Sequence, residues 1–147
     1  MKQLAILLIL FFISSSFITE KEQHPGHPIK LANTTWKVNG KCLESEDQSS
    51  FSITSYVETK DISSRWGYSI SFTEKTFSTS YSAPCGNDCF TSVSGTYELT
   101  DNEILFCVKN ISRNGFCSQE SETPKMSYRL FKITETKNGL TFVKISK

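Results

Sequence analysis

The sequence predicts an all-β domain, in the form of a small antiparallel β-barrel or meander of about eight short strands. Three observations lead to this prediction. From residue 34 on, apolar side chains recur at every second position, which is the period of a β-strand. Polar turn segments separate these short apolar runs. The 147 residues also include five cysteines behind an export signal, which favours stabilisation by disulfides.

The first 16 residues have the order of a secretory signal peptide. Lys2 supplies a positive start, residues 4–13 are an unbroken apolar run, and Ser14 and Ser16 place small side chains before a cleavage site. The apolar stretch is shorter than the roughly 20 residues of a spanning helix, so we expect cleavage and no transmembrane segment afterwards. No cysteine precedes Cys42, which leaves no attachment point for a lipid anchor. We therefore expect an exported chain, periplasmic or secreted and not lipid-anchored.

Residues 17–33 are predicted to form a flexible linker, and residues 34–147 form the β-domain. The linker contains both histidines, His24 and His27, beside Pro25, Gly26 and Pro28. A domain without histidine lacks the base of Ser-His-Asp and Cys-His catalysis, so we predict that it is not an enzyme. A proline-glycine stretch offers no preorganised metal site, and we predict neither a metal nor a cofactor.

The strands are predicted from apolar residues that recur at every second position, with mostly polar residues between them. A change of parity between Leu130 and Phe131 predicts a β-bulge in the last but one strand. The alternating sets are Phe51, Ile53; Tyr68, Ile70, Phe72; Phe77, Thr79, Tyr81; Val93, Gly95, Tyr97, Leu99; Ile104, Phe106, Val108; Tyr128, Leu130; and Leu140, Phe142.

Two hairpin turns, with positive backbone φ angles, are predicted at residues 101–102 and 138–139. The first of them sets a register in which Leu99 faces Ile104. Continued along the hairpin, this register brings the region of Cys85 beside Cys117. We therefore predict a disulfide from Cys117 to Cys85 or Cys89, and leave Cys42 and Cys107 undecided.

Charged residues argue against several classes of partner. Without Lys2 the mature chain would carry 15 basic and 15 acidic residues, scattered along the sequence, so we predict no nucleic-acid binding. Glu44, Glu46 and Asp47 form the tightest acidic cluster, but they lack the register of a calcium loop. We interpret this cluster as a solvated loop.

The aromatic residues allow two interpretations. They can fill the core of a small barrel, which we favour, or they can line a cavity for a small apolar ligand. The candidates for cavity lining are Trp36, Phe51, Tyr68, Phe72, Tyr97 and Phe106.

Most of residues 34–145 carry short motifs in a recognisable order. These are Thr34-Thr35-Trp36-Lys37-Val38, Ile70-Ser71-Phe72 with Phe77, Cys85-Gly86-Asn87, Ser94-Gly95-Thr96-Tyr97-Glu98-Leu99, Ile104-Leu105-Phe106, Cys117, and Asn138-Gly139-Leu140-Thr141-Phe142. The order resembles the META domain (HslJ-like) of bacterial exported proteins, and the Trp36 opening also resembles lipocalin-like barrels. The resemblance implies an envelope or secreted β-domain and brings no catalytic residues.

These observations predict an exported, non-enzymatic β-domain with a role in the cell envelope or in protein contact. The alternative is a lipocalin-like carrier of a small apolar ligand. A third interpretation is an inhibitor or adhesin that presents the loops at residues 43–50 and 110–125. The partner itself, an envelope protein or a small apolar ligand, is not identified by the sequence.

Overall fold

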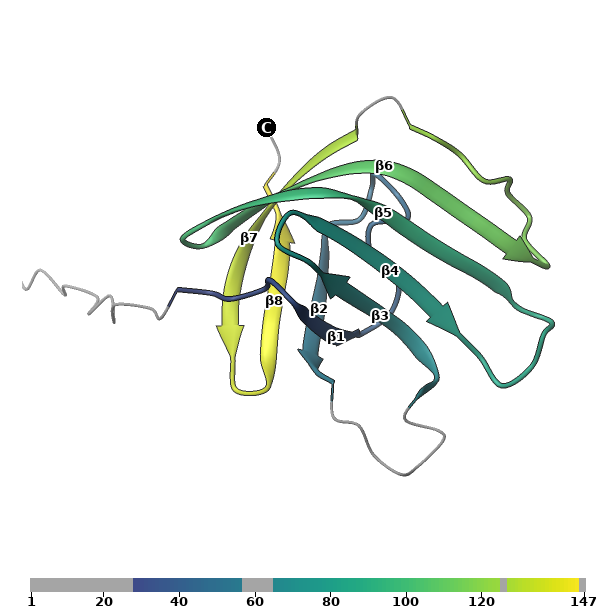
Figure 1. The fold of residues 1–147 in the computed structure, drawn as a ribbon, viewed down its shortest axis with the longest axis horizontal. Coiled ribbons are helices and arrows are strands. Elements are labelled where there is room, and N and C mark those ends of the chain that lie inside the picture. Colours follow the sequence, from purple (N-terminus) through teal and green to yellow (C-terminus); the bar gives the residue numbers. More distant parts are fainter. Residues whose placement is uncertain (1–27, 57–64, 125–126, 146–147) are drawn as a thin grey trace, which may run out of the picture.

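A computed structural model describes residues 28–56, 65–124 and 127–145. The predicted signal peptide and residues 17–27 of the linker lie outside the described residues. Eight strands form a closed antiparallel barrel, as predicted (Figure 1). They are β1 (Thr34–Val38), β2 (Ser50–Ser55), β3 (Gly67–Phe72), β4 (Thr76–Ser82), β5 (Cys89–Thr100), β6 (Glu103–Gly115), β7 (Ser127–Thr136) and β8 (Gly139–Lys144).

The order of strands around the barrel differs from the order in the chain at one place. Strands β3 to β8 form a meander, in which each strand pairs with the next. Strand β2 pairs with β8 and β1, and β1 pairs with β3, so β1 lies between β2 and β3. Every neighbouring pair is antiparallel, and the ring of pairings closes. Among the described residues, no helix is long and apolar enough to cross a bilayer.

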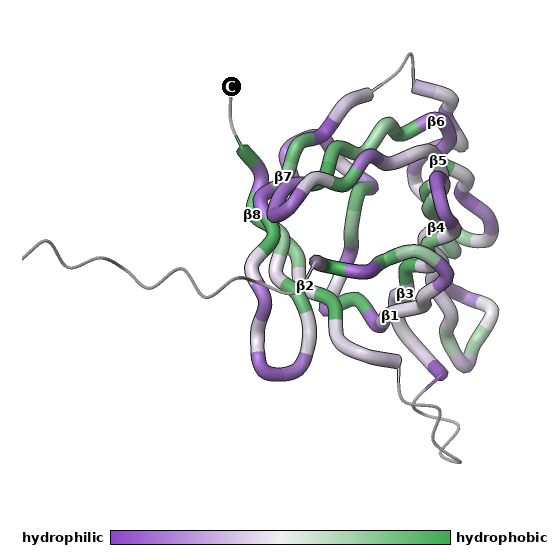
Figure 2. Tube along the Cα trace, turned by 60° about the vertical axis from the view of Figure 1, so that its left-hand side comes forward, coloured by the Kyte–Doolittle hydropathy of each residue, from purple (hydrophilic) through white to green (hydrophobic). Residues whose placement is uncertain are grey.

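Phenylalanine rings fill the inside of the barrel. Phe51 stacks on Phe142 with ring centroids 4.5 Å apart, and Phe106 and Phe77 form a T-shaped pair with centroids 4.9 Å apart. Phe131 approaches Phe51 at 5.4 Å. Figure 2 shows hydrophobic positions alternating with hydrophilic ones along the strands, as the period of two predicts. Burial of each such ring contributes about 1.5–3 kcal/mol to folding.

The predicted bulge in β7 is wrong. The registers of β7 with β6 and β8 continue without a shift. Tyr128 is 59% exposed on the outer face, and Arg129 takes the inward position that leads on to Phe131. The sequence pattern assigned Tyr128 to the inner face because the residues that do face inward at the start of β7, Ser127 and Arg129, are polar. The register shift occurs instead in β5–β6, where Ser94 pairs with Asn110 and Gly95 with Val108.

Both predicted hairpins form. The first has its turn at residues 101–102, as predicted, and the second has its turn at residues 137–138, one residue earlier than predicted, so that Gly139 begins β8. Neither turn has the positive φ angles that we expected. None of Asp101, Asn102, Asn138 and Gly139 adopts such an angle. In both turns a threonine just before the turn donates its hydroxyl to the carbonyl three residues on, from Thr100 to Glu103 (3.3 Å) and from Thr136 to Gly139 (3.0 Å). Gly139 is needed for space instead, because a Cβ there would lie 1.9 Å from the carbonyl oxygen of Ile53.

The predicted register of the β5–β6 hairpin is confirmed from the turn as far as Gly95 opposite Val108, and beyond that point the pairing moves by one residue. The predicted disulfide of Cys117 is confirmed, with Cys89 as its partner. Leu99 pairs with Ile104, and the ladder continues to Cys89 opposite Gly115. Cys117, two residues further, is bonded to Cys89, with the Cα atoms 4.6 Å apart. The thiols of Cys42, Cys85 and Cys107 are free, and only that of Cys85 is exposed.

We predict that Cys117→Ser lowers the free energy of unfolding by about 3 kcal/mol, because the bond closes a loop in the unfolded chain. The sequence separation of 28 residues sets the size of that loop. The matched control is Cys85→Ser, which removes a free thiol at the same end of the barrel. Urea unfolding under non-reducing conditions measures both, and equal stabilities would contradict the prediction.

A second prediction concerns the crowded backbone beside the register shift. A Cβ at Gly95 would lie 2.0 Å from the carbonyl oxygen of Cys107, whereas a Cβ at Gly86 would meet nothing within 4 Å. Gly95→Ala should therefore lower unfolding stability by about 2 kcal/mol or more, since the backbone must move. Gly86→Ala should change it by less than about 0.5 kcal/mol. Thermal unfolding of the two variants side by side provides the comparison.

Candidate functional site

The six residues predicted as cavity lining lie in or against the core. Phe51, Phe72, Tyr97 and Phe106 are buried, and Trp36 and Tyr68 pack against them while partly exposed. Phe72 and Tyr97 form a T-shaped pair with ring centroids 5.2 Å apart, and the centroids of Phe51 and Phe106 lie 6.4 Å apart. The Tyr97 hydroxyl donates to the carbonyl of Thr73 (2.8 Å). These ring contacts favour the interpretation of the aromatic set as core.

One end of the barrel carries the disulfide, and we call it the disulfide end. Residues 39–49, here called the cap segment, connect β1 to β2 at this end and fold back on themselves. The amide of Leu43 donates to Oε1 of Gln48 (2.7 Å), and Nε2 of Gln48 donates to the carbonyl of Lys41 (2.6 Å). Cys42 and Leu43 are thereby buried in the hydrophobic core. The cap segment thus covers the phenylalanine core at this end.

The buried guanidinium of Arg129 fastens the cap segment to β7. Its Nη1 donates to the carbonyls of Leu43 (2.7 Å) and Ser45 (3.0 Å), and its Nε to the hydroxyl of Ser127 (3.3 Å). The Ser127 hydroxyl in turn donates to Oε1 of Glu46 (2.9 Å). Arg129 is only 4% exposed, and this burial lowers the pKa of its guanidinium. Three hydrogen bonds compensate part of the cost of that burial.

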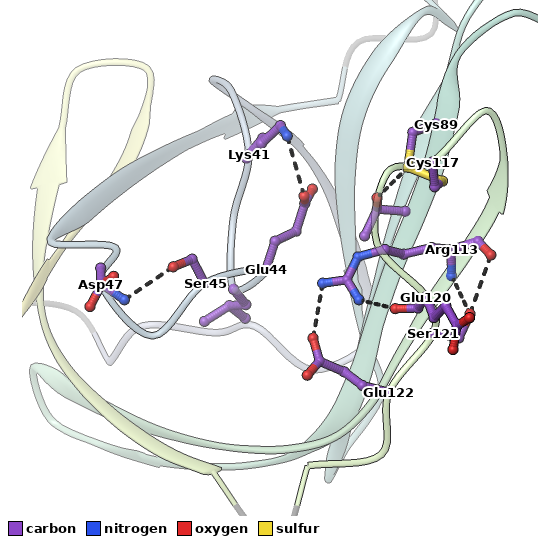
Figure 3. Close-up of polar contacts among 12 residues, drawn as sticks. Lys41, Glu44, Ser45, Asp47, Cys89, Arg113, Cys117, Glu120, Ser121 and Glu122 are labelled. Carbon is purple, nitrogen blue, oxygen red and sulfur yellow. Dashed lines mark hydrogen bonds and ion pairs between the residues drawn. A yellow bond between two sulfur atoms is a disulfide. The ribbon is translucent and has the colours of Figure 1, made fainter.

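A second wall of the site comes from residues 116–124, here called the return segment. Arg113 of β6 holds it through an ion pair with Glu122 (2.9 Å) and a hydrogen bond to the carbonyl of Glu120 (2.6 Å) (Figure 3). The backbones of Ile111 and Glu122 exchange two hydrogen bonds of 2.8 Å. With the disulfide at Cys117, these contacts hold the return segment beside β6.

Between the cap and return segments lies a cleft of about 270 Å³. Its polar lining is Arg113, Arg129, Glu44, Glu46, Glu122, Ser45 and Gln119, and its apolar lining is Ile111 and Pro124.

The two arginines of the cleft differ in their partners. Among the described residues, Arg113 forms an ion pair, but no carboxylate lies within 4 Å of the Arg129 guanidinium. None of the hydrogen bonds between described residues uses Nη2 of Arg129. This nitrogen belongs to a buried side chain that lines the cleft. Its two N–H groups donate to no described residue, so a ligand oxygen in the cleft can accept from them.

Burial has a different effect on the acidic and thiol groups of the cap segment. It raises the pKa of the Glu44 carboxyl, against the opposing charges of Lys41 (3.7 Å away) and Arg113. Burial, with a smaller effect of Glu44, raises the pKa of Cys42 to about 12. Cys42 therefore stays a protonated thiol and is unsuited to nucleophilic chemistry. Within the described ranges, no three His, Cys, Asp or Glu side chains are placed to hold a metal ion.

Sequence reasoning identified only part of this site. It assigned Glu44, Glu46 and Asp47 to a solvated loop; Glu46 and Asp47 are indeed exposed, but Glu44 and Glu46 also line the cleft. It missed Arg129 altogether. The inward parity of Phe131 and Ile133, counted backward, would have placed Arg129 inside the barrel. A buried arginine in a strand is rare enough to be a useful signal.

Arg129→Met should lower the free energy of unfolding by about 2 kcal/mol, because the carbonyl of Leu43 loses a buried donor and that of Ser45 a partly buried one. Methionine keeps much of the side chain's bulk. Lys132→Met changes an exposed cation on the same strand and is the control. Hydrogen exchange should be faster at the Leu43 amide in the Arg129 variant alone; unchanged exchange would mean that the guanidinium does not fasten the cap segment.

Comparison with family models, with curated proteins and with solved structures finds no match to this chain. The structure by itself shows an eight-stranded antiparallel barrel with a disulfide, and the comparisons assign it to no family.

Proposed function

We propose that this chain is an exported, non-enzymatic binding domain that acts in the cell envelope or in protein contact through the cleft at its disulfide end. The observation that carries the proposal is the cleft itself, with the buried guanidinium of Arg129 in its lining. A buried charge with donors left over is expensive to maintain in a fold. A buried arginine whose N–H groups are not all used therefore indicates a binding surface.

The packing of the barrel supports this choice of surface. A lipocalin-like carrier would bind its ligand along the barrel axis, where Phe51, Phe106, Phe131 and Phe142 contact one another. Loops at the end of a rigid barrel are the usual alternative place for recognition. Here both walls of the cleft are held to the strands, by Arg129 on one side and by Arg113 and the disulfide on the other.

The sequence supports the remaining parts of the proposal. The signal peptide at residues 1–16 and the cysteine content favour export. The order of motifs that resembles the META domain favours a place in a bacterial envelope. Because both histidines precede the barrel, at His24 and His27, the domain has no imidazole to act as a general base.

The proposal is tested by photo-crosslinking in intact cells of the source organism. A photoreactive amino acid replaces Gln119, which is exposed in the cleft lining, or Thr134, which is exposed on β7. We expect one discrete adduct with an envelope component from position 119 and none from position 134. The adduct should disappear when Glu46→Gln is added.

Two results would contradict the proposal. Equal labelling from both positions, or none, would mean that the cleft is not the contact surface. Turnover of a hydrolase or transferase substrate that is lost on changing Glu44 or Glu122 would show that the domain is an enzyme.

A further inference from the structure

We infer that the cleft at the disulfide end takes one ring of a carbohydrate, a neutral ligand rich in hydroxyl groups. This inference rests on the proposed function, because it names the ligand class of the same cleft. It follows from the donors, the acceptors, the charge balance and the size of the cleft.

The donor side of the cleft is the guanidinium of Arg129. Three of its N–H groups are held by the protein, on the carbonyls of Leu43 and Ser45 and on the hydroxyl of Ser127. The two on Nη2 are directed by the same planar group and cannot turn independently. A ligand oxygen that accepts from Nη2 therefore meets a preorganised donor. A hydrogen bond from an ionised donor is about twice as strong as one between neutral groups.

The acceptor side consists of carboxylates. Glu46 accepts a hydrogen bond from Ser127 through Oε1, and among the described residues no hydrogen bond uses its other carboxylate oxygen, which can accept from a ligand. Glu122 uses Oε1 for the ion pair with Arg113 and is half exposed. The Glu44 carboxyl faces Lys41 at 3.7 Å. Each carboxylate can accept from a ligand hydroxyl, since its two oxygens offer about four lone pairs.

The charges around the cleft nearly cancel. Arg113 and Arg129 stand against Glu44, Glu46 and Glu122, and Lys41 adds a third cation beside Glu44. Neither a strong anion nor a strong cation is favoured by such a balanced set. A hydroxyl group can accept from Arg129 and donate to a carboxylate at the same time. Adjacent hydroxyls on a sugar ring satisfy both sides of the cleft without bringing in a charge.

The size and apolar lining of the cleft fit a single ring. Its volume of about 270 Å³ lies just below the range of about 300–1,000 Å³ for pockets of drug-sized ligands. Ile111 and Pro124 supply an apolar patch for the C–H face of a pyranose. Rigid walls reduce the entropy lost on binding. The disulfide from Cys89 to Cys117 supplies that rigidity to the return segment.

The inference is tested with the full mature chain by two-dimensional NMR. The probes are the methyl glycosides of glucose, galactose, mannose and N-acetylglucosamine; the comparison compounds are acetate, methylammonium and glycine. We expect at least one glycoside to shift the signals of Gln119, Glu122 and the Arg129 guanidinium with saturable binding. Glu46→Gln should weaken that binding about tenfold, as the loss of one charge-assisted hydrogen bond. The control Glu74→Gln, an exposed glutamate in the β3–β4 turn, should leave it unchanged.

Two outcomes would overturn the inference: no glycoside binds, whether or not a comparison compound does, or the shifts lie away from the cleft. A folded-state spectrum of Glu46→Gln that matches the parent chain excludes loss of structure as the cause of weaker binding. The crosslinking result is independent of this one. An envelope protein captured from position 119 without glycoside binding would leave the proposed function standing and remove only the carbohydrate.

Discussion

A closed sheet of eight strands encloses a space just wide enough for side chains to fill, and protein interiors are packed with few voids. In this chain the filling is done by phenylalanine rings around Phe106, which contacts Phe51, Phe77 and Phe131. Every strand must present its apolar residues to this cluster. The register of each pairing follows from that requirement, since a slip by one residue would turn the rings outward.

The same constraint explains why polar chemistry gathers at the disulfide end. The cap segment brings Leu43 down onto the rings, and its carbonyls then need donors away from water. Arg129 supplies these donors. It is the inward-facing residue of β7 that directly precedes the apolar Phe131 on the same face. A guanidinium has more donors than this task requires. Arg129 also lines the cleft, where its Nη2 group can donate to the proposed ligand. One buried side chain therefore contributes both to the stability of the barrel and to its proposed binding surface.

The disulfide and the arginines act on different parts of this surface. The disulfide between Cys89 and Cys117 lowers the conformational entropy of the unfolded chain, and it holds one end of the return segment in the folded protein. The ion pair of Arg113 with Glu122 holds the other end. The cap segment has no covalent tie and depends on Arg129 and Gln48. Loss of Arg129 should therefore loosen the cap segment, while loss of the disulfide should loosen the return segment.

The sequence by itself determined the strands, because a period of two is a local pattern that each run of residues carries alone. It also determined the β5–β6 register near Leu99 and Ile104, and with it the neighbourhood of Cys117, since a two-residue turn sets both. Only the tertiary structure decided the place of β1 between β2 and β3, the choice of Cys89 over Cys85, and the partners of Arg129 in the cap segment. These depend on contacts between segments far apart in the chain, as the bond from Arg129 to Leu43 shows across a separation of 86 residues. No local pattern encodes such contacts, because their energy exists only once the barrel has closed.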